Sequence, residues 1–198
     1  MRGKVSCMKL ENIVILSGPS GAGEDSIIAG LGIKTRINRV ITTTTREKRP
    51  GESDGSPYYF ISKDAFEDTI RSNEMIEWAK QYNDNLYGVT KSELERVNSL
   101  PGVGVWKIEY QGVISAKKLF PEIKAIFIMA DSLEVLAERI RKRGNVSESY
   151  IQERMEYTKE WLKHQDIYDY KVINRQGKLD EAIAEVMEIL RKEGYNLS

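Results

Sequence analysis

The chain has 198 residues, with 30 basic and 30 acidic side chains and a single cysteine, Cys7. This length suits one domain with a substantial core, and the cancelling charges give no bulk attraction to a nucleic acid or to a membrane surface. One cysteine excludes an internal disulfide framework, and no apolar run approaches the roughly 20 residues of a membrane span or forms the core of a signal peptide, so we expect a soluble, cytoplasmic protein.

Strand-like and helix-like segments alternate along the chain, which favours an α/β fold with a mostly parallel sheet. The expected strands are 12–17, 37–42, 103–109, 124–129 and 170–173. The expected helices are 25–31, 63–72, 90–98, 111–119, 132–142, 147–164 and 178–193. Between residues 43 and 90, prolines and glycines interrupt a polar segment and aromatic residues follow, so we predict an inserted substrate-binding subdomain there.

The most informative stretch is the glycine-rich loop between the first expected strand and the first expected helix. It keeps the glycine frame of G-x-x-x-x-G-K-[ST], in which backbone N–H groups at a helix N-terminus hold phosphates. The loop consists of Gly18, Pro19, Ser20, Gly21, Ala22, Gly23, Glu24, Asp25 and Ser26. Glu24 replaces the Lys that reaches the β- and γ-phosphates, and Asp25 replaces the hydroxyl residue that holds Mg²⁺. We therefore predict an ATP-binding loop whose charge has been altered.

These two replacements change the formal charge of the loop by three units, two from Lys to Glu and one from the hydroxyl to Asp. At 4 Å and an effective dielectric near 20, one charge pair is worth roughly 4 kcal/mol. Because ~1.4 kcal/mol is tenfold in rate, even half of the Lys-to-Glu reversal costs about three orders of magnitude. Two arrangements stay open: one carboxylate folds back onto the N–H groups of the loop, or both point outward to hold Mg²⁺.

Several short motifs further along the chain resemble those of guanylate kinases. The segment TTREKRPGESDG from Thr44, followed by YYF from Tyr58, resembles the signature segment of that family. The resemblance continues in order over roughly residues 12–192, through NEMIEWA from Asn73, YG from Tyr87, QG from Gln111 and LFP from Leu119.

The resemblance implies a nucleoside monophosphate kinase fold, with a P-loop NTPase-type parallel sheet core flanked by helices, an inserted GMP-binding subdomain and a helical lid. The implied division is a core of about 10–42, 91–135 and 165–198, a GMP-binding subdomain of about 43–90 and a lid of about 136–164. The implied reaction is phosphoryl transfer from ATP to GMP, giving ADP and GDP, with Mg²⁺.

The resemblance also assigns residues to a GMP site. It implies a phosphate clamp of Arg46, Arg49, Tyr58 and Tyr87, and guanidinium forks with hydroxyl donors suit a dianionic phosphate. It further implies that Glu77 reads the guanine, that Thr42 touches the base and that Glu109 faces the guanine and metal region. Taken singly, each of these residues also has an ordinary structural explanation, such as a solvated loop charge or a strand aromatic.

Arginines near the expected lid match a further family feature. Arg139, Arg143 and Arg154 resemble the arginines that close over the phosphates and stabilise charge during transfer, so they are the predicted catalytic residues. The alternative is a basic helix end that meets the helix dipole. Asn174 matches a position that contacts adenine.

Two residues depart from the family pattern. Val89 stands where a Ser or Thr usually follows Tyr-Gly, and Lys107 stands where the family has a carboxylate, on the same strand face as Glu109. Three hypotheses stay open: a guanylate kinase in which Mg²⁺ or a cation such as Lys107 replaces the lost lysine, a GMP-binding pseudokinase, and a non-catalytic interaction module.

Overall fold

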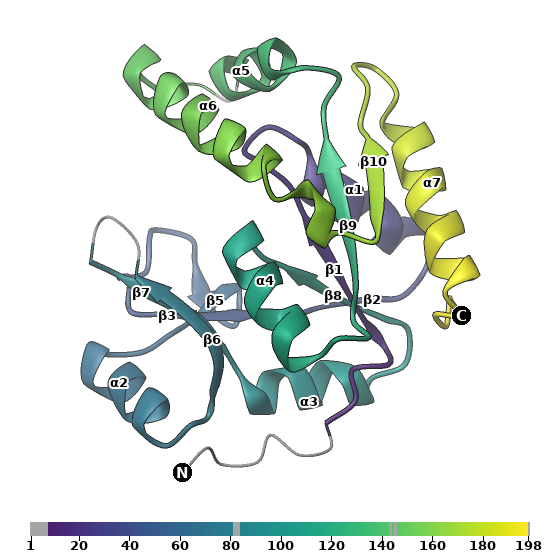
Figure 1. Ribbon diagram of the computed structural model, residues 1–198. Coiled ribbons are helices and arrows are strands. Elements are labelled where there is room, and N and C mark those ends of the chain that lie inside the picture. Colours follow the sequence, from purple (N-terminus) through teal and green to yellow (C-terminus); the bar gives the residue numbers. More distant parts are fainter. Residues whose placement is uncertain (1–7, 81–83, 143, 145, 198) are drawn as a thin grey trace.

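The computed structural model describes residues 8–80, 84–142, 144 and 146–197. Its centre is a five-stranded parallel sheet in the order β10-β9-β1-β8-β2 (Figure 1). The strands are β1 (Ile13–Ser17), β2 (Ile37–Arg39), β8 (Val103–Lys107), β9 (Lys124–Met129) and β10 (Tyr170–Ile173). The sheet and its topology confirm the α/β prediction.

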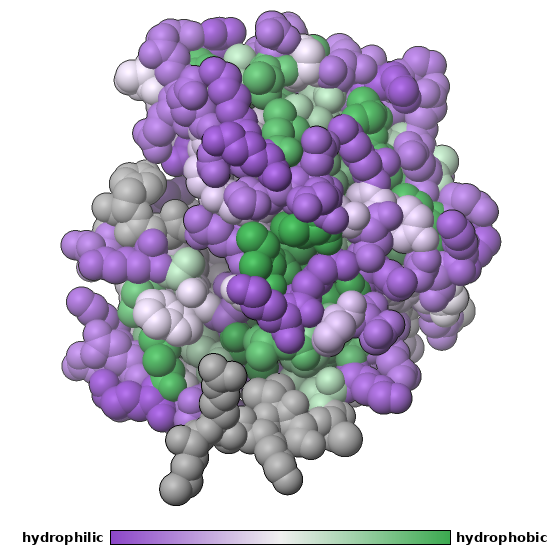
Figure 2. All heavy atoms as spheres, in the orientation of Figure 1, coloured by the Kyte–Doolittle hydropathy of each residue, from purple (hydrophilic) through white to green (hydrophobic). Residues whose placement is uncertain are grey.

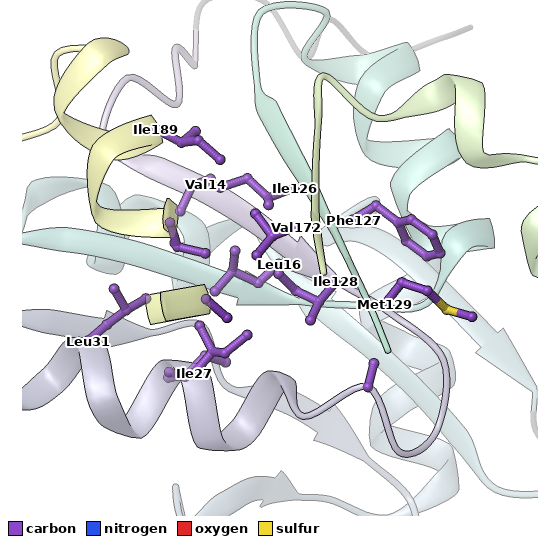
Figure 3. Packing of buried hydrophobic residues seen from close by; sticks show 14 of the residues in the cluster. Val14, Leu16, Ile27, Leu31, Ile126, Phe127, Ile128, Met129, Val172 and Ile189 are labelled. Atoms are coloured by element: carbon purple, nitrogen blue, oxygen red, sulfur yellow. The ribbon is translucent and has the colours of Figure 1, made fainter. Parts of the chain in front are cut away.

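Helices cover both faces of this central sheet, which explains why β1 is apolar at successive positions. Val14 and Leu16 pack with α1 (Glu24–Lys34) and α7 (Leu179–Lys192) in one buried cluster, part of which is seen in Figure 3. Ile13 and Ile15 belong to a second cluster on the other face, under α3 (Lys91–Ser99) and α4 (Tyr110–Leu119). The rigid sheet fixes the loop that follows β1.

Residues 42–90 build a second, mixed sheet in the order β4-β5-β3-β7-β6. Its elements are β3 (Thr42–Thr44), β4 (Ser53–Asp54), β5 (Pro57–Phe60), β6 (Met75–Lys80) and β7 (Leu86–Thr90), with α2 (Lys63–Arg71) between β5 and β6. β3 pairs in parallel with β5 and antiparallel with β7. This sheet lies to one side of the central sheet, below the helices α5 (Leu133–Lys142) and α6 (Glu148–Leu162) in Figure 1.

We call α5 (Leu133–Lys142) and α6 (Glu148–Leu162) the lid helices. A small buried cluster of Ala137, Ile140 and Ile151 joins them to each other. The Trp161 ring of α6 packs on Tyr110 of α4, with centroids 5.5 Å apart, and its indole N–H donates to the Tyr168 hydroxyl at 2.8 Å. The base of α6 is therefore anchored to the central sheet and its flanking helices. A short 3-10 helix, Gln165–Ile167, follows α6.

Two of the expected strands end earlier than predicted. The single strand expected over 37–42 is divided, because the Ile41 N–H is bound by the Glu93 carboxylate at 2.8 Å instead of by a strand neighbour. The chain leaves the central sheet at this point and enters the second. The strand expected over 103–109 ends at Lys107, since Glu109 takes the position before the first turn of α4.

The face shown in Figure 2 carries mainly hydrophilic side chains, and hydrophobic ones gather near its middle, over α4. Within the described ranges, none of the helices combines the length and the apolar character needed to span a membrane.

Candidate functional site

The glycine-rich loop joins β1 to α1 at the carboxyl-terminal edge of the parallel strands, where α/β proteins bind ligands. Gly21 and Gly23 have φ angles of 89° and 97°, which residues with side chains rarely adopt. The Ala22 N–H donates to the Pro19 carbonyl at 3.0 Å in the turn that leads into α1. The loop thus ends on a helix N-terminus, whose N–H groups favour an anion.

Two predicted site residues, Asn174 and Arg139, form hydrogen bonds to the backbone of this loop. The buried side-chain amide of Asn174 donates to the Ala22 carbonyl at 2.8 Å. The Arg139 guanidinium donates to the carbonyl oxygens of Asn174 at 2.8 Å and of Gly21 at 3.3 Å. Neither side chain lines the two cavities described below. In this structure both hold the loop in shape, although the resemblance implies contact with adenine for Asn174 and with phosphate for Arg139.

A cavity of about 750 Å³ lies between the second sheet, the start of α4 and the lid helix α6. All seven residues expected at a GMP site line it: Thr42, Arg46, Arg49, Tyr58, Glu77, Tyr87 and Glu109. Its wall also includes Lys107, Gln111, Gly112, Arg154 and Tyr157. The fold therefore brings the whole predicted set together around one space.

Cationic and aromatic side chains form one part of this wall. Glu52 accepts two hydrogen bonds from the Arg46 guanidinium, at 2.8 and 2.9 Å, and one from the Arg49 backbone N–H at 2.8 Å. The Arg46 guanidinium lies 5.4 Å over the Tyr58 ring, and the Tyr87 ring meets Tyr58 edge-on with centroids 5.9 Å apart. Two guanidinium groups beside two phenol hydroxyls are the donors that a phosphate dianion requires.

Two carboxylates, Glu77 of β6 and Glu109 before α4, form another part of the wall. Burial, and then the charge of Glu109, raise the pKa of Glu77 to about 7. Gly112 lies beside this group: a methyl group at Gly112 would meet the Ile108 side chain at 3.2 Å and Glu77 Oε2 at 3.6 Å. An ionised Glu77 has two oxygens that can accept two neighbouring N–H groups of a ligand.

A second cavity, of about 230 Å³, lies against the glycine-rich loop. Its loop residues are Gly18, Ser20, Gly21, Glu24 and Asp25. It shares five residues with the larger cavity: Lys107, Ile108, Glu109, Arg154 and Tyr157. Glu24 is buried at the loop, with 9% of its surface exposed. The two cavities therefore adjoin, so that groups bound in each would meet beside the end of β8.

Asp25 is bound by two cations from neighbouring strands. Its Oδ1 lies 2.8 Å from the Arg39 guanidinium and its Oδ2 lies 2.5 Å from the Lys107 ammonium. Burial acts to raise the pKa of Asp25, but the hydrogen bonds and charges of Lys107 and Arg39 outweigh it and hold that pKa below its usual value. The resemblance implies a carboxylate at position 107, and against that expectation Lys107 returns two of the three charge units that Glu24 and Asp25 remove.

The residues around Asp25 do not fit a magnesium ion. Mg²⁺ requires oxygen ligands in near-octahedral geometry, but both Asp25 oxygens bind protein cations and the Lys107 ammonium stands beside them. In the part of the chain that the structure describes, no group of three or more His, Cys, Asp or Glu side chains is placed to hold a metal. Of the two arrangements that the sequence left open for the loop carboxylates, the one in which both hold Mg²⁺ does not fit the ion pairs of Asp25. The arrangement in which one carboxylate folds back onto the loop N–H groups stays a prediction for Glu24.

The lid helix α6 contributes Arg154 and Tyr157 to both cavities. The Tyr157 hydroxyl donates to Glu109 Oε2 at 2.7 Å. The Arg154 guanidinium donates to Glu153 at 3.0 Å, while its buried Nε has no hydrogen-bond partner among the described residues. The predicted catalytic residue Arg143 lies outside the described residues.

The departure at Val89 does not touch the cavity. Val89 is fully buried in the cluster that includes Leu94 and Val97 of α3. The hydroxyl of the next residue, Thr90, accepts the Glu93 N–H at 3.2 Å and caps α3. The Val89 substitution therefore affects core packing rather than the lining of the site.

Three contacts at the site were not predicted from the sequence. Glu52, which binds the Arg46 guanidinium, lies inside the signature segment. Its acidic side chain among basic ones is a pattern that could have predicted an ion pair there. The bonds from Tyr157 to Glu109 and from Lys107 to Asp25 join residues 48 and 82 positions apart. No local pattern indicates such pairs.

A glycine-rich loop at the edge of a parallel sheet, beside two adjoining cavities, defines a P-loop α/β protein of the nucleotide-binding class. Comparisons with known proteins are more specific, since the family model for guanylate kinase matches residues 10–193. Guanylate kinase of Hydrogenovibrio crunogenus is 39% identical over 179 residues, which cover 90% of this chain and 86% of that protein. Guanylate kinase of Histophilus somni is 37% identical over 186 residues, covering 92% and 88%.

A solved structure agrees with these relatives. The crystal structure of guanylate kinase from Anaplasma phagocytophilum matches with a TM-score of 0.69 and 27% identity, covering 91% of this chain and 85% of that one. The chain therefore belongs to the guanylate kinase family.

Proposed function

We propose that this protein binds GMP in the larger cavity and ATP at the glycine-rich loop, and that it transfers a phosphoryl group from ATP to GMP, giving ADP and GDP. The observation that carries this proposal is the gathering of all seven expected GMP residues around one cavity, which adjoins the loop cavity. In the same proposal, residues of about 43–90 form the GMP-binding subdomain, about 136–164 the lid, and the remaining segments the core. The cytoplasmic location stays a prediction.

GMP recognition divides between the two parts of the cavity wall. Arg46, Arg49, Tyr58 and Tyr87 bind the phosphate, because their N–H and O–H groups supply charge-assisted hydrogen bonds. Glu77 accepts the guanine N1–H and exocyclic N–H together, and the hydroxyl of Thr42 makes a further contact with the base. Adenine has an acceptor at N1 instead of this donor, so it leaves the Glu77 carboxylate without its partner.

Transfer takes place where the two cavities adjoin. Arg154 is the arginine best placed to stabilise the transferring phosphoryl group, since it lines both cavities and its Nε is buried without a partner in the described structure. Arg139 and Arg143 act with it by family resemblance. For Arg139 this requires exchanging the carbonyl oxygens of Gly21 and Asn174 for a phosphate.

The transfer is slower than in relatives with an intact loop. Members of the family use ATP with Mg²⁺, and their loop lysine balances the charge of the ATP phosphates. Glu24 and Asp25 remove that balance, and Lys107 restores only part of it. The side chains around Asp25 do not fit a metal ion, since both carboxylate oxygens bind protein cations.

A GMP-binding pseudokinase is the second candidate. The buried position of the Glu24 side chain at the loop cavity favours it, because a carboxylate there opposes the binding of ATP phosphates. In this case the GMP site remains and the loop serves only as scaffold.

Two measurements separate the candidates. Calorimetric titration with GMP, AMP and ATP reports which nucleotide binds, and a coupled assay for ADP reports transfer to GMP. GMP binding with slow, GMP-dependent ADP formation supports the proposed kinase. GMP binding without ADP formation supports the pseudokinase, and equal binding of AMP and GMP contradicts the proposed acceptor site.

A further inference from the structure

Lys107 lies where the two cavities adjoin, at the end of the central strand β8. Its side chain is 37% exposed, and its ammonium is held 2.5 Å from Asp25 Oδ2. Arg39, from the neighbouring strand β2, binds the other oxygen of the same carboxylate at 2.8 Å. Asp25 therefore fixes one cation, with a second beside it, at the boundary between the proposed acceptor cavity and the loop cavity.

The formal charge of this three-residue cluster is positive, with two cations and one carboxylate. The carboxylates Glu24 and Glu109 also line the loop cavity, and the cations Lys107 and Arg154, which line both cavities, offset them. An anionic phosphate that reaches the boundary thus meets cations belonging to the protein. A divalent metal ion at the same place would be repelled by Lys107 and would compete with Lys107 and Arg39 for the Asp25 oxygens.

We propose that Lys107 is a phosphate-binding residue that takes the place of a divalent metal, so that a nucleoside diphosphate binds across the two cavities without Mg²⁺. This proposal rests on the proposed function for the guanosine and its first phosphate. The second phosphate extends from the Arg46 and Arg49 donors towards the loop and is bound by the Lys107 ammonium. Asp25 is a positioning residue, because it acts by holding that ammonium in place.

The probe for the test is GDP, with GMP as its reference. GMP lacks the second phosphate, so its binding reports the acceptor site, and the difference between GDP and GMP reports the contact at the boundary. Each nucleotide is titrated calorimetrically into the protein with excess Mg²⁺ and with EDTA. We expect the Kd for GDP to change less than threefold between these conditions.

Two variants and one control identify the group responsible. In EDTA, Lys107→Ala should weaken the binding of GDP at least tenfold and the binding of GMP less than threefold. Lys118→Ala, which removes an exposed lysine of α4, should change the affinity for neither nucleotide. The double variant Asp25→Ser with Lys107→Asp recreates the family pattern of hydroxyl and carboxylate. It should therefore bind GDP at least threefold more tightly with Mg²⁺ than with EDTA. Melting curves establish that each variant is folded.

The outcomes separate this inference from the proposed function. Normal GMP binding combined with a threefold or greater effect of Mg²⁺ on GDP binding in the natural protein would overturn the inference alone. Equal losses of GDP affinity in Lys107→Ala and Lys118→Ala would also overturn it. Failure of the natural protein to bind GMP would overturn the proposed function itself.

Discussion

The Tyr157 hydroxyl of the lid helix α6 donates a 2.7 Å hydrogen bond to Glu109 Oε2 at the start of α4. Both residues line both cavities, so the bond joins the lid to the centre of the proposed site. Burial, and then the negative charge of Glu109, raise the pKa of Tyr157. The hydroxyl therefore keeps its proton across the neutral range and remains a donor.

Replacing Tyr157 by Phe removes this bond while keeping the ring. We expect a loss of about 0.5–1.5 kcal/mol in the free energy of unfolding and faster amide hydrogen exchange along α6, because a hydrogen bond between lid and core is lost. Tyr150→Phe is the matched control, since that side chain on the same helix is 37% exposed. Equal exchange in α6 of the two variants would contradict a link through Tyr157.

Local patterns predicted most of the central sheet, because β1, β8, β9 and β10 are rich in apolar and β-branched residues. The division at Ile41 could not be predicted in this way, since residues 37–42 are uniformly compatible with a strand. What ends β2 is the carboxylate of Glu93, 52 positions away, which binds the Ile41 N–H. A long-range side-chain contact here outweighs a local preference.

The difference between local patterns and long-range contacts also applies to the site. Family spacing predicted which residues surround the larger cavity, but it carried no information about what the substituted residues do. Asp25 and Lys107 each stood out as departures from the family pattern expected by resemblance, and only the fold shows that they form an ion pair with each other. Asn174 and Arg139 were expected at the ligand, whereas their hydrogen bonds lie behind the loop.

Removing Arg49 should weaken GMP binding without weakening the fold. Arg49→Ala removes a phosphate donor and should cost roughly 1.5–3 kcal/mol of GMP affinity, the scale of a charged hydrogen bond. Arg46→Ala should cost a similar affinity and also destabilise the protein, since it leaves the half-buried Glu52 carboxylate without its guanidinium partner. Calorimetry with GMP and urea denaturation measure the two effects.

Arg71→Ala, at an exposed arginine of α2 in the same subdomain, is the control for lost charge. It should change neither the free energy of GMP binding nor the free energy of unfolding by more than about 0.5 kcal/mol. A loss of GMP affinity as large as that of Arg49→Ala would show that net charge, rather than a local contact, governs binding.

Ionisation of Glu77 should govern GMP affinity near neutral pH. With its pKa at about 7, the carboxyl is mostly protonated at pH 6 and mostly ionised at pH 8, and only the ionised form accepts both guanine N–H groups. GMP affinity should therefore rise roughly tenfold between these pH values. Glu77→Gln binds GMP weakly and reports the titration of the GMP phosphate by itself, so the difference between the two pH profiles measures Glu77.

The stability of the free protein should respond in the opposite sense. Because the folded-state pKa of Glu77 is raised, the folded state holds more protons than the unfolded state between about pH 4.5 and pH 7. The contribution of Glu77 to stability is thus greatest below that range and decreases as pH rises through it. At pH 8, Glu77→Gln should be about 1–3 kcal/mol more stable than the natural protein in urea denaturation.

Glu93 should be important for stability rather than for binding. Its carboxylate is 3% exposed and accepts the Ile41 N–H at 2.8 Å and two hydrogen bonds from Arg96 at 2.8 and 2.7 Å. Glu93→Ala should lower the free energy of unfolding by about 2–4 kcal/mol, whereas Glu95→Ala, at an exposed position of the same helix, should change it by less than about 0.5 kcal/mol. A normal urea midpoint for Glu93→Ala would contradict this role.

Restoring the loop should raise the rate of phosphoryl transfer. Glu24→Lys with Asp25→Ser returns the lysine and the hydroxyl of the motif, and it also releases Lys107 from its carboxylate partner. We expect at least a tenfold rise in GMP-dependent ADP formation. This corresponds to lowering the activation free energy by about 1.4 kcal/mol, a fraction of the electrostatic energy that the altered loop loses. Glu185→Lys, an exposed charge reversal on α7, reproduces two of the three units by which the loop variant changes the net charge and so serves as the control for net charge. A natural protein that already turns over at roughly 10 s⁻¹, a typical enzyme rate, would contradict the prediction, because the loop would then need no lysine.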